Sequence, residues 1–316
     1  MATIERSFGP NSTTREVLSG IDLQGKTALI TGASGGLGAE TARALAAAGA
    51  NVILTARDLI RGQSVAESIR GESPNVQVEL QELELDSFAS VRRSADAILA
   101  GTPSLDLLIN NAGIMGCPLM RTSEGHEMQF GTCHLGHFLL TAKLIPALRR
   151  APAARVINLS SAGHFLGGMD LEDPDFHAKP YDKWAAYGQA KTANILFSVG
   201  LEARFGREGI HSFAVHPGAI ATDLGRHLDS ADIELLMGGK DGKTLEFKTV
   251  DAGAATTCWG ASAPELEGRG GSYLLDCRVA SLSDEATEGV AAYAIDSQTA
   301  EALWELSESA CDVQFA

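Results

Sequence analysis

The sequence predicts a single-domain, doubly wound α/β fold with a seven-stranded parallel sheet and helices on both faces. From Lys26 onward, short aliphatic and β-branched runs alternate with longer helical stretches. The strand runs are continuously apolar, which is typical of a parallel sheet buried on both faces. The length of 316 residues also lies within the range of one such domain.

Each element follows from this alternation. The predicted strands span residues 26–31, 51–55, 76–80, 105–109, 155–159, 210–215 and 271–275. The predicted helices span 38–48, 59–69 and 87–99, with longer ones near 123–150 and 182–205. Right-handed crossovers between parallel strands then give the doubly wound arrangement. We expect an N-terminal arm at 1–24 that serves packing or subunit contact, a main domain at 25–280, and a partly helical extension at 281–316.

Two stretches interrupt the alternation. Residues 163–183 are rich in Gly, Asp and Pro and predict an inserted loop. Residues 219–248 contain Gly239, Gly242 and many charges, and predict a mobile substrate flap. Segments of this kind on a rigid sheet usually carry specificity. A plain surface insertion is the alternative for each.

Composition excludes several classes of partner. There are 25 Lys and Arg against 40 Asp and Glu, a formal net charge of −15. This charge repels phosphate backbones and anionic lipid, so we expect no nucleic-acid or membrane partner. The five scattered cysteines form no Cys-x-x-Cys pair and favour free thiols in a reducing cytoplasm. No signal peptide or bilayer-length apolar run is visible, so we expect a cytoplasmic protein.

A glycine-rich turn at 31–38 follows the first predicted strand and opens a helix. Gly32 fits a tight turn, Gly36 fits close approach to a pyrophosphate, and Gly38 fits close packing of helix on sheet. The phosphate is expected at the positive end of the helix. Ser34 and Leu37 complete the predicted contacts of this Rossmann-type turn. A glycine-rich turn without a ligand is the alternative.

The end of the second strand indicates which cofactor is preferred. NAD-specific sites usually place a carboxylate there to hold the ribose 2′-hydroxyl. This chain has Ala56 followed by Arg57, and the next residue, Asp58, fits a helix cap. A missing acid and an adjacent guanidinium favour a 2′-phosphate, hence NADP(H) over NAD(H). An exposed structural Arg57 is the alternative.

Tyr187 and Lys191 stand four residues apart and so share one face of a predicted helix. There the cation stabilises the phenolate, so the tyrosine pKa is expected to fall below its ordinary value of about 10. A tyrosine of this kind can pass a proton near neutral pH. Together with the phosphate-binding turn, the pair predicts hydride transfer to or from a carbonyl. An ordinary exposed helix pair is the alternative.

Five ordered motifs resemble the short-chain dehydrogenase/reductase superfamily over roughly residues 20–280. They are Thr-Gly-x-x-x-Gly-x-Gly at 31–38, Asn110-Asn111-Ala112-Gly113, Ser160-Ser161, Tyr187-x-x-x-Lys191 and His216-Pro217-Gly218. The runs at 53–58 and 134–141 are most similar to the branch of retinol dehydrogenase-like, WW-domain oxidoreductase-like and protochlorophyllide reductase-like proteins. The branch does not by itself transfer a substrate.

The resemblance implies roles for the catalytic residues. Tyr187 protonates the substrate oxygen as general acid, and Ser161 hydrogen-bonds the same oxygen. Ser161 is chosen over Ser160 because the family places the active serine second in the pair. Lys191 lowers the pKa of Tyr187 and binds the nicotinamide ribose.

The resemblance also implies cofactor contacts and an assembly. Asp86 is expected to receive the adenine amino group. Ribose and nicotinamide contacts are expected from Asn111, Ala112, Gly113, Pro217, Gly218 and Thr222, with Thr222 on the carboxamide. The family commonly pairs subunits through the helices near 123–150 and 182–205, so a homodimer or homotetramer is expected.

Cys133 departs from the family pattern, which has asparagine at this position. The asparagine helps to hold a water that connects the lysine to solvent as a proton relay, and a thiol cannot replace the amide geometry. Three interpretations stay open. The enzyme is active but slower, or it uses a neighbouring group such as His134, or it binds cofactor without turnover.

Substrate and metal predictions rest on single residues. His164 and Phe165, directly after the serines, are expected to line a pocket for an apolar or aromatic carbonyl or alcohol substrate, as are Met115 and Cys117. His134 and His137 have metal-compatible spacing but no visible third ligand, so we expect packing or subunit contact and no metal. The predicted function is an NADP(H)-dependent oxidoreductase interconverting carbonyl and alcohol. The alternatives are a carbon–carbon double-bond reductase and a cofactor-binding protein with impaired catalysis.

Overall fold

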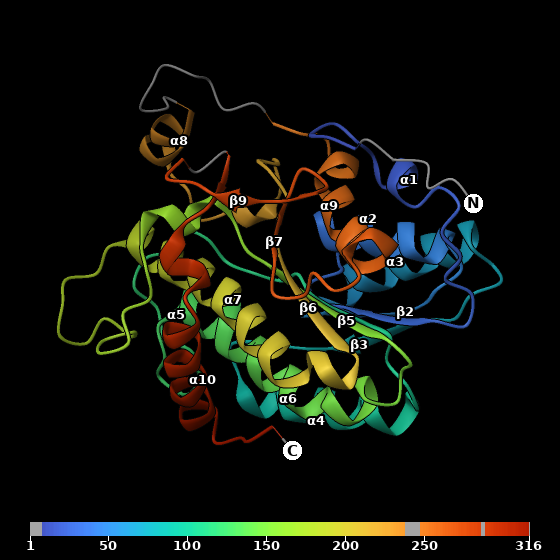
Figure 1. Cartoon of the computed structure of the whole chain (residues 1–316), viewed down its shortest axis with the longest axis horizontal. Helices are drawn as coiled ribbons and strands as arrows, with labels where there is room; N and C mark the ends of the chain where they lie inside the picture. Colours follow the sequence, from blue (N-terminus) through green and yellow to red (C-terminus); the bar gives the residue numbers. More distant parts are fainter. Residues whose placement is uncertain (1–7, 238–246, 286–287, 316) are drawn as a thin grey trace.

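The computed structural model describes residues 8–237, 247–285 and 288–315. They form an eight-stranded sheet of order β3-β2-β1-β4-β5-β6-β7-β8 with helices on both faces (Figure 1), and a separate parallel pair of short strands at 281–282 and 289–290. The strands are β1 (Thr27–Ile30), β2 (Asn51–Ala56), β3 (Val78–Glu82), β4 (Leu107–Asn110), β5 (Ala154–Leu159), β6 (Ile210–His216), β7 (Tyr273–Leu275) and β8 (Arg278–Val279). The predicted doubly wound α/β class is confirmed.

The sheet has one strand more than predicted. Strands β1 to β7 pair in parallel, and β8 pairs antiparallel with β7. The two residues between them, Asp276 and Cys277, have φ angles of +51° and +55°. A two-residue hairpin turn with both residues left-handed usually has the sequence Asn-Gly or Asp-Gly, which makes it predictable. Asp-Cys gives no such signal, so β8 could not be predicted from the sequence.

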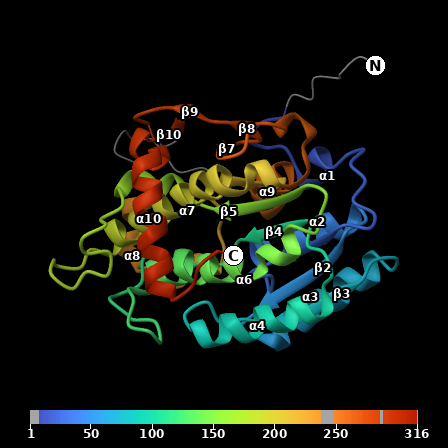
Figure 2. The same ribbon diagram turned by 60° about the horizontal axis from the view of Figure 1, so that its bottom comes forward.

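Helices cover the sheet in two layers, each with its own apolar core (Figures 1 and 2). One core includes residues of α4 (Phe88–Gly101), α6 (Gly136–Leu148), α7 (Lys183–Phe205) and α10 (Ser297–Cys311). The other includes residues of α1 (Thr14–Val17), α2 (Gly36–Ala47), α3 (Leu59–Glu72) and α9 (Val250–Ser262). In β1, Leu29 joins the first core, whereas Ala28 and Ile30 join the second. This alternation explains why the strand is apolar on both faces.

Side-chain caps fix where the helices begin. Asp58 accepts a hydrogen bond from the amide of Arg61 at 3.0 Å, which confirms the predicted cap of α3. Asp182 accepts from the amides of Trp184 and Ala185, both at 2.8 Å, and so starts α7. Such caps satisfy amides that have no partner within the helix. The start of α7 places Tyr187 in the second turn of that helix.

Short elements surround the sheet. They are α5 (Met128–Phe130), η1 (Gly131–Leu135), η2 (Ala162–Leu166), η3 (Gly206–Glu208), η4 (Asp223–Gly225), α8 (Ser230–Met237), η5 (Pro264–Leu266), β9 (Ser281–Leu282), β10 (Gly289–Val290) and η6 (Ala292–Ile295). The predicted loop at 163–183 begins inside η2. From 167 to 182 it has no helix or strand. The predicted flap includes η4 and α8, but Gly239 and Gly242 lie outside the described residues.

Both terminal segments pack on the main domain. In the arm, Thr14 donates from Oγ1 to Glu40 of α2 at 2.7 Å, and its amide donates to Asp251 of α9 at 2.8 Å. At the other end, α10 packs on α7 (Figure 2). The ring of Trp304 lies 5.1 Å from that of Phe138 in α6. The chain's own C-terminal helix therefore covers part of the surface that we expected to pair subunits.

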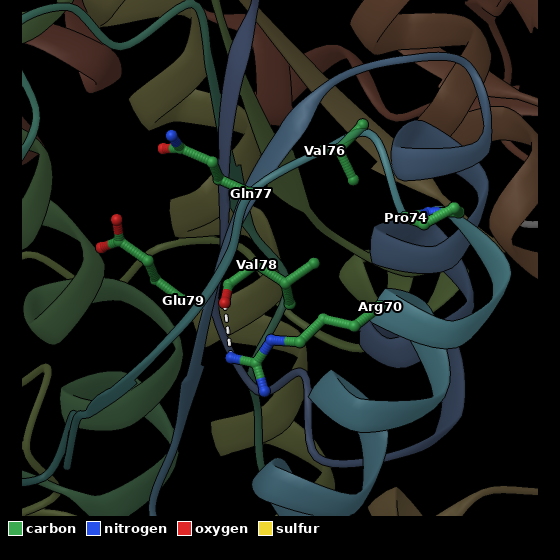
Figure 3. A pocket seen from close by; sticks show the side chains of 6 residues that line it. All are labelled: Arg70, Pro74, Val76, Gln77, Val78 and Glu79. Atoms are coloured by element: carbon green, nitrogen blue, oxygen red, sulfur yellow. Dashed lines mark hydrogen bonds between the residues drawn. The ribbon is translucent and has the colours of Figure 1, made fainter.

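A hollow of about 620 Å³ lies along the edge strand β3, and none of its lining residues is a predicted site residue (Figure 3). Its lining residues are Arg70, Pro74, Val76, Gln77, Val78 and Glu79. Arg70 donates to the main-chain oxygen of Val78 at 2.5 Å. A charged side chain over an edge strand hinders pairing with another chain, so Arg70 protects this edge. Across the described ranges, no helix is both long and apolar enough to cross a bilayer.

Candidate active site

The predicted site residues gather at the carboxyl ends of the parallel strands. Thr31 follows β1, Arg57 follows β2, Asn111 follows β4, Ser160 follows β5 and Pro217 follows β6. In open α/β sheets, ligands bind in the crevice outside these ends. The sheet order thus brings segments distant in sequence to one edge.

The glycine turn between β1 and α2 depends on missing side chains. Gly32 has φ +66°, and a β-carbon there would lie 2.8 Å from Cβ of Ala112. A β-carbon on Gly38 would lie 2.5 Å from the main-chain oxygen of Gly32. Gly38 therefore allows α2 to approach the turn closely. Ser34 and Leu37 are half-buried within the same segment.

The start of α2 fits a phosphate group. Its N-cap residue, Gly35, provides no side-chain hydrogen bond to the first turn. Gly36 has φ +55°, and a β-carbon there would lie 3.4 Å from Cγ2 of Thr222. The opening between the turn and Thr222 is therefore kept free by glycine. Uncapped amides at the positive end of a helix suit an anion.

Thr31 joins the glycine turn to the turn after β4. Its Oγ1 accepts hydrogen bonds from the amides of Asn111 at 2.9 Å and Ala112 at 3.0 Å. The Asn111 side chain donates to the main-chain oxygen of Thr31 at 2.7 Å. The side chain of Asn111 thus holds the two turns together. We quoted Thr31 as part of the motif but did not assign it this role.

Tyr187, Lys191 and Ser161 come together between α7 and the end of β5. The side chains of Tyr187 and Lys191 lie on α7, with 4% and 3% of each residue exposed. Nζ of Lys191 lies 5.6 Å from the centre of the Tyr187 ring and donates to the main-chain oxygen of Leu159 at 3.1 Å. Ser161 is hydrogen-bonded to Tyr187. Ser160 instead donates to the main-chain oxygen of Lys191 at 2.8 Å.

The pKa of Tyr187 differs from the expectation. Burial raises the pKa of the phenol above its ordinary value of 10.0. The charge of Lys191 and the hydrogen bond with Ser161 both lower it, as expected, but by less than burial raises it. The cause is loss of solvation of the phenolate, which is the charged form. Tyr187 is therefore a protonated acid at neutral pH.

Two further glycines leave room around the catalytic side chains. A β-carbon on Gly163 would lie 2.7 Å from Cε1 of Tyr187 and 3.3 Å from Oγ of Ser161. A β-carbon on Gly113 would lie 3.4 Å from Sγ of Cys133 and 3.7 Å from Nζ of Lys191. The same space beside Gly113 is thus bordered by the thiol and the ammonium group.

Cys133 lies fully buried in η1, a π-helical turn that precedes α6. Its thiol accepts from the amide of Ile114 and donates to the main-chain oxygen of Ile114, both at 3.5 Å. Single π-helical turns within α-helices often occur at functional sites. The structure thus places the residue that departs from the family pattern near Lys191.

The two histidines of this helix occupy packed positions, as expected. His134 lies among the rings of Phe130, Phe138 and Phe197, and its Nε2 is 2.8 Å from Oγ of Ser307 in α10. Burial lowers its pKa to about 3. The polar contact of His134 is with α10 and not with Lys191. It therefore does not favour His134 as a replacement for the missing asparagine in the proton relay.

His137 has a different structural role. Its Nε2 lies 2.8 Å from Oγ1 of Thr31, and its Nδ1 donates to the main-chain oxygen of Cys133 at 2.9 Å. Burial lowers the pKa of His137 to about 4, so it is neutral near pH 7. It links the glycine turn to η1. Within the described residues, no group of three metal-binding side chains is found.

The substrate-pocket expectation needs a correction at His164. The residue is fully buried, and both ring nitrogens have hydrogen-bond partners inside the protein. Phe165 packs its ring 4.2 Å from that of His164 and joins an apolar cluster with Tyr273. Both nitrogens of His164 are thus occupied within the protein, whereas the predicted place of the half-buried Phe165 in a substrate pocket stays a prediction.

The other two predicted pocket residues, Met115 and Cys117, lie in the segment after Gly113. Met115 is half-buried. Cys117 is fully buried, and burial raises the pKa of its thiol to about 11. A side chain that does approach this segment is Leu228 of the flap, whose Cδ2 would lie 2.8 Å from a β-carbon on Gly116. The same point lies 3.7 Å from the Trp184 ring.

The cofactor side includes an arginine that sequence analysis missed. Arg57 is exposed at the end of β2. Four residues later, Arg61 places Nη2 3.2 Å from the point that a β-carbon on Gly35 would occupy. Arg61 also forms an ion pair with Asp223 of the flap at 2.8 Å. The sequence did contain a signal for Arg61, because it lies in the first turn of α3, four residues after Arg57.

The remaining predicted contacts are dispersed around the same edge. Gly218, directly after Pro217, has φ +95°, and a β-carbon there would lie 2.7 Å from Cε of Lys248. Asp86 lies between β3 and α4, and its main-chain oxygen accepts from the amide of Ser123 at 2.9 Å. His216, which we quoted only as a motif residue, accepts from the amide of Ala162 at 3.2 Å. It therefore supports the turn that holds Ser161.

Comparison with known proteins agrees with this geometry. The family model described as short chain dehydrogenase matches residues 26–232. The short-chain dehydrogenase/reductase prx1 of Penicillium rubens is 40% identical, covering 92% of this chain and 86% of that protein. Retinol dehydrogenase 12 of Mus musculus is 38% identical, covering 93% and 89%.

Solved structures show the same likeness. The crystal structure of an uncharacterized protein from Mycobacterium paratuberculosis superposes with a TM-score of 0.73 at 35% identity, covering 97% of this chain and 99% of that one. A short chain dehydrogenase from Burkholderia cenocepacia in complex with NADP gives 0.64 at 25% identity, covering 80% and 96%. The chain therefore belongs to the short-chain dehydrogenase/reductase family, in its retinol dehydrogenase-like branch.

Proposed function

We propose that this protein is an NADP(H)-dependent oxidoreductase that interconverts a carbonyl and an alcohol on an apolar or aromatic substrate. The observation that carries the proposal is the convergence of Ser161, Tyr187 and Lys191 at the carboxyl end of β5. A buried phenol, a hydroxyl bonded to it and a nearby ammonium group are suited to proton exchange with a substrate oxygen.

The chain's own residues would handle the proton. When bound, the nicotinamide cofactor supplies or accepts the hydride. In the reductive direction Tyr187 donates its phenolic proton to the oxygen on which negative charge grows, a contribution of roughly 10²–10⁴ in rate. Ser161 already accepts from the amide of Gly163 at 3.0 Å. The same hydroxyl, which is hydrogen-bonded to Tyr187 here, would turn its hydrogen to the substrate oxygen and orient it.

Lys191 would stabilise the phenolate that remains after proton transfer. Its charge already acts in that direction on Tyr187. The hydrogen bond from Nζ to the main-chain oxygen of Leu159 fixes the position of the ammonium group. In the oxidative direction the same residues act in reverse, with Tyr187 phenolate accepting the alcohol proton.

The preference for NADP(H) rests on the end of β2. No carboxylate stands at Ala56, and the exposed Arg57 follows it. Arg61 adds a second guanidinium group beside the glycine turn. Arginine suits a phosphate through paired hydrogen bonds. The NADP complex of the Burkholderia relative supports this choice.

Cys133 favours a second candidate, a cofactor-binding protein with impaired catalysis. The thiol near Lys191 makes two long contacts, both of 3.5 Å, to the main chain of Ile114. It cannot hold a water as an amide does.

The assembly as a homodimer or homotetramer and the cytoplasmic location stay predictions.

The direct test follows consumption of NADPH, with NADH alongside, by purified protein on a panel of aldehydes, ketones, quinones and enones. Turnover of carbonyls with preference for NADPH supports the proposal. NADPH binding without turnover of any substrate supports the second candidate. Reduction of an enone at its alkene would identify a carbon–carbon double-bond reductase instead.

A further inference from the structure

His164 connects the catalytic serine to the C-terminal part of the chain. Its Nδ1 lies 2.7 Å from the main-chain oxygen of Ser161. Its Nε2 accepts a hydrogen bond at 3.1 Å from the amide of Ala291, which is 127 residues away in sequence. The imidazole is fully buried, with the ring of Tyr273 5.1 Å away. One side chain thus bridges the turn after β5 and the segment after β10.

The two partners fix the tautomer of the ring. A backbone amide can only donate, so Nε2 carries the lone pair. A carbonyl oxygen can only accept, so Nδ1 carries the hydrogen. His164 is therefore a neutral imidazole with the hydrogen on Nδ1. Burial, which lowers its pKa to about 4, agrees with this neutral form.

The turn that carries Ser161 depends on these contacts. The main-chain oxygen of Ser161 accepts from the amide of His164 at 3.1 Å as well as from its ring. The hydroxyl of Tyr293 donates to the main-chain oxygen of His164 at 2.6 Å. The C-terminal segment 289–295 thus contacts the turn at two points. The family model matches residues 26–232, so the segment 289–295 lies beyond the part of the chain that this model describes.

We propose that His164 is a positioning residue through which the C-terminal segment 289–295 holds Ser161 in place for catalysis. Ala291 sets the tautomer of the imidazole, and the imidazole then donates to the main chain of Ser161. The inference rests on the proposed function, because it assigns the effect to the serine that faces Tyr187. The segment 289–295, which lies beyond the residues that the family model matches, thereby becomes part of the catalytic scaffold.

Two replacements of His164 separate its two hydrogen bonds. The amide nitrogen of asparagine can occupy the place of Nδ1 and keep the bond to Ser161, but asparagine is too short to reach Ala291. Glutamine can place its oxygen near Nε2 and keep the bond from Ala291, but it loses Ser161. We expect His164→Asn to retain kcat within roughly threefold of the parent, and His164→Gln to lower it roughly 10- to 100-fold. The dissociation constant of NADPH should be similar in all three proteins.

Ala291→Pro removes the donor to Nε2 and places the proline ring where the amide hydrogen now meets the imidazole, 3.1 Å from the nitrogen. Ala291 has φ −67°, which proline adopts without strain, and Val290 before it is in a strand. In the parent, we expect this change to lower kcat roughly tenfold, because the imidazole loses its donor, is displaced by the proline ring and no longer holds Ser161 in place. In His164→Asn it should cause no further loss, since the asparagine amide donates to Ser161 without help from Ala291 and is too short to meet the proline ring. Such a double-mutant cycle isolates the coupling between the two positions.

Nitrogen NMR of ¹⁵N-histidine-labelled protein reads the tautomer without any turnover. The proposal predicts a neutral His164 with the hydrogen on Nδ1 in the parent, and loss of that single form in Ala291→Pro. A hydrogen on Nε2 in the parent would overturn it. Equal kcat in His164→Asn and His164→Gln would also overturn it, as would an equal loss from Ala291→Pro in both backgrounds. An inactive parent with the expected tautomer would instead count against the proposed function alone.

Discussion

Gly163 lies so close to Tyr187 that a β-carbon on it would be 2.7 Å from Cε1 of the tyrosine ring. The ring is buried on α7 and has little room to move. Gly163→Ala should therefore displace the phenol from Ser161. We expect kcat to fall by roughly 10²-fold, because a shift of about 1 Å in a catalytic group has that effect.

Gly168→Ala provides a matched control in the same loop. A β-carbon there would lie 3.7 Å from Cδ2 of Tyr293, which is an ordinary contact. Steady-state kinetics of both variants should show the loss only at Gly163. Similar kcat values for Gly163→Ala and the parent would show that the spacing between this glycine and Tyr187 does not matter for catalysis.

Cys133→Asn should raise turnover, by roughly tenfold if the proton relay limits the parent enzyme. An asparagine could accept from the amide of Ile114 and donate to its main-chain oxygen, as the thiol does now at 3.5 Å. It would also provide an amide next to the space beside Gly113. The measurement is kcat with NADPH at saturating substrate.

Cys133→Ala serves as the control, because it removes the thiol without supplying an amide. A thermal unfolding curve for each variant checks that the larger asparagine is accepted in this buried position. If Cys133→Asn is folded, binds NADPH and turns over no faster than the parent, the relay is not limited at this position.

Arg57→Asp should weaken NADPH binding by roughly tenfold or more and change NADH binding much less, because a carboxylate repels the 2′-phosphate. The measurement is a fluorescence titration with each cofactor. Arg207→Asp is the control. It makes the same change of charge at the exposed Arg207, which lies in η3 just before β6 and so at the end of the sheet opposite the predicted site. Equal losses for both cofactors in Arg57→Asp would show that Arg57 does not read the 2′-phosphate.

The pH dependence should differ between the two directions. Reduction needs the phenol of Tyr187, and burial raises its pKa above 10.0. The acid form then persists across the neutral range, so reductive kcat should be flat from about pH 6 to about pH 9. Oxidation needs the phenolate, so its kcat should rise with pH over the same range. A reductive rate that falls steeply through neutral pH would contradict a raised pKa.

The sequence predicted the central strands well because their signal is local. The expected strands at 51–55, 155–159 and 210–215 each differ from the structure by at most one residue at either end. The edge strand was expected at 76–80 and is found at Val78–Glu82. Its burial is uneven, with Val78 buried and Glu82 exposed, so the apolar run does not mark its end. The π-helical turn at 131–135 has no comparable local signature.

The site could be predicted only where the chemistry is contained in short motifs. The helix spacing of Tyr187 and Lys191 is an example, and the structure places both side chains in one buried region. His164 shows where this approach fails. Its decisive partner, Ala291, is 127 residues away, so a neighbouring motif could not distinguish a pocket residue from a bridge to the C-terminal segment.

The most direct test of the account compares the parent with Tyr187→Phe on the best carbonyl substrate found. Turnover with NADPH and the dissociation constant of NADPH are measured for both proteins. We expect the variant to bind NADPH almost as tightly but to lose turnover by at least roughly 10²-fold, because only the phenolic proton donor is removed. Turnover by Tyr187→Phe close to that of the parent would contradict the account.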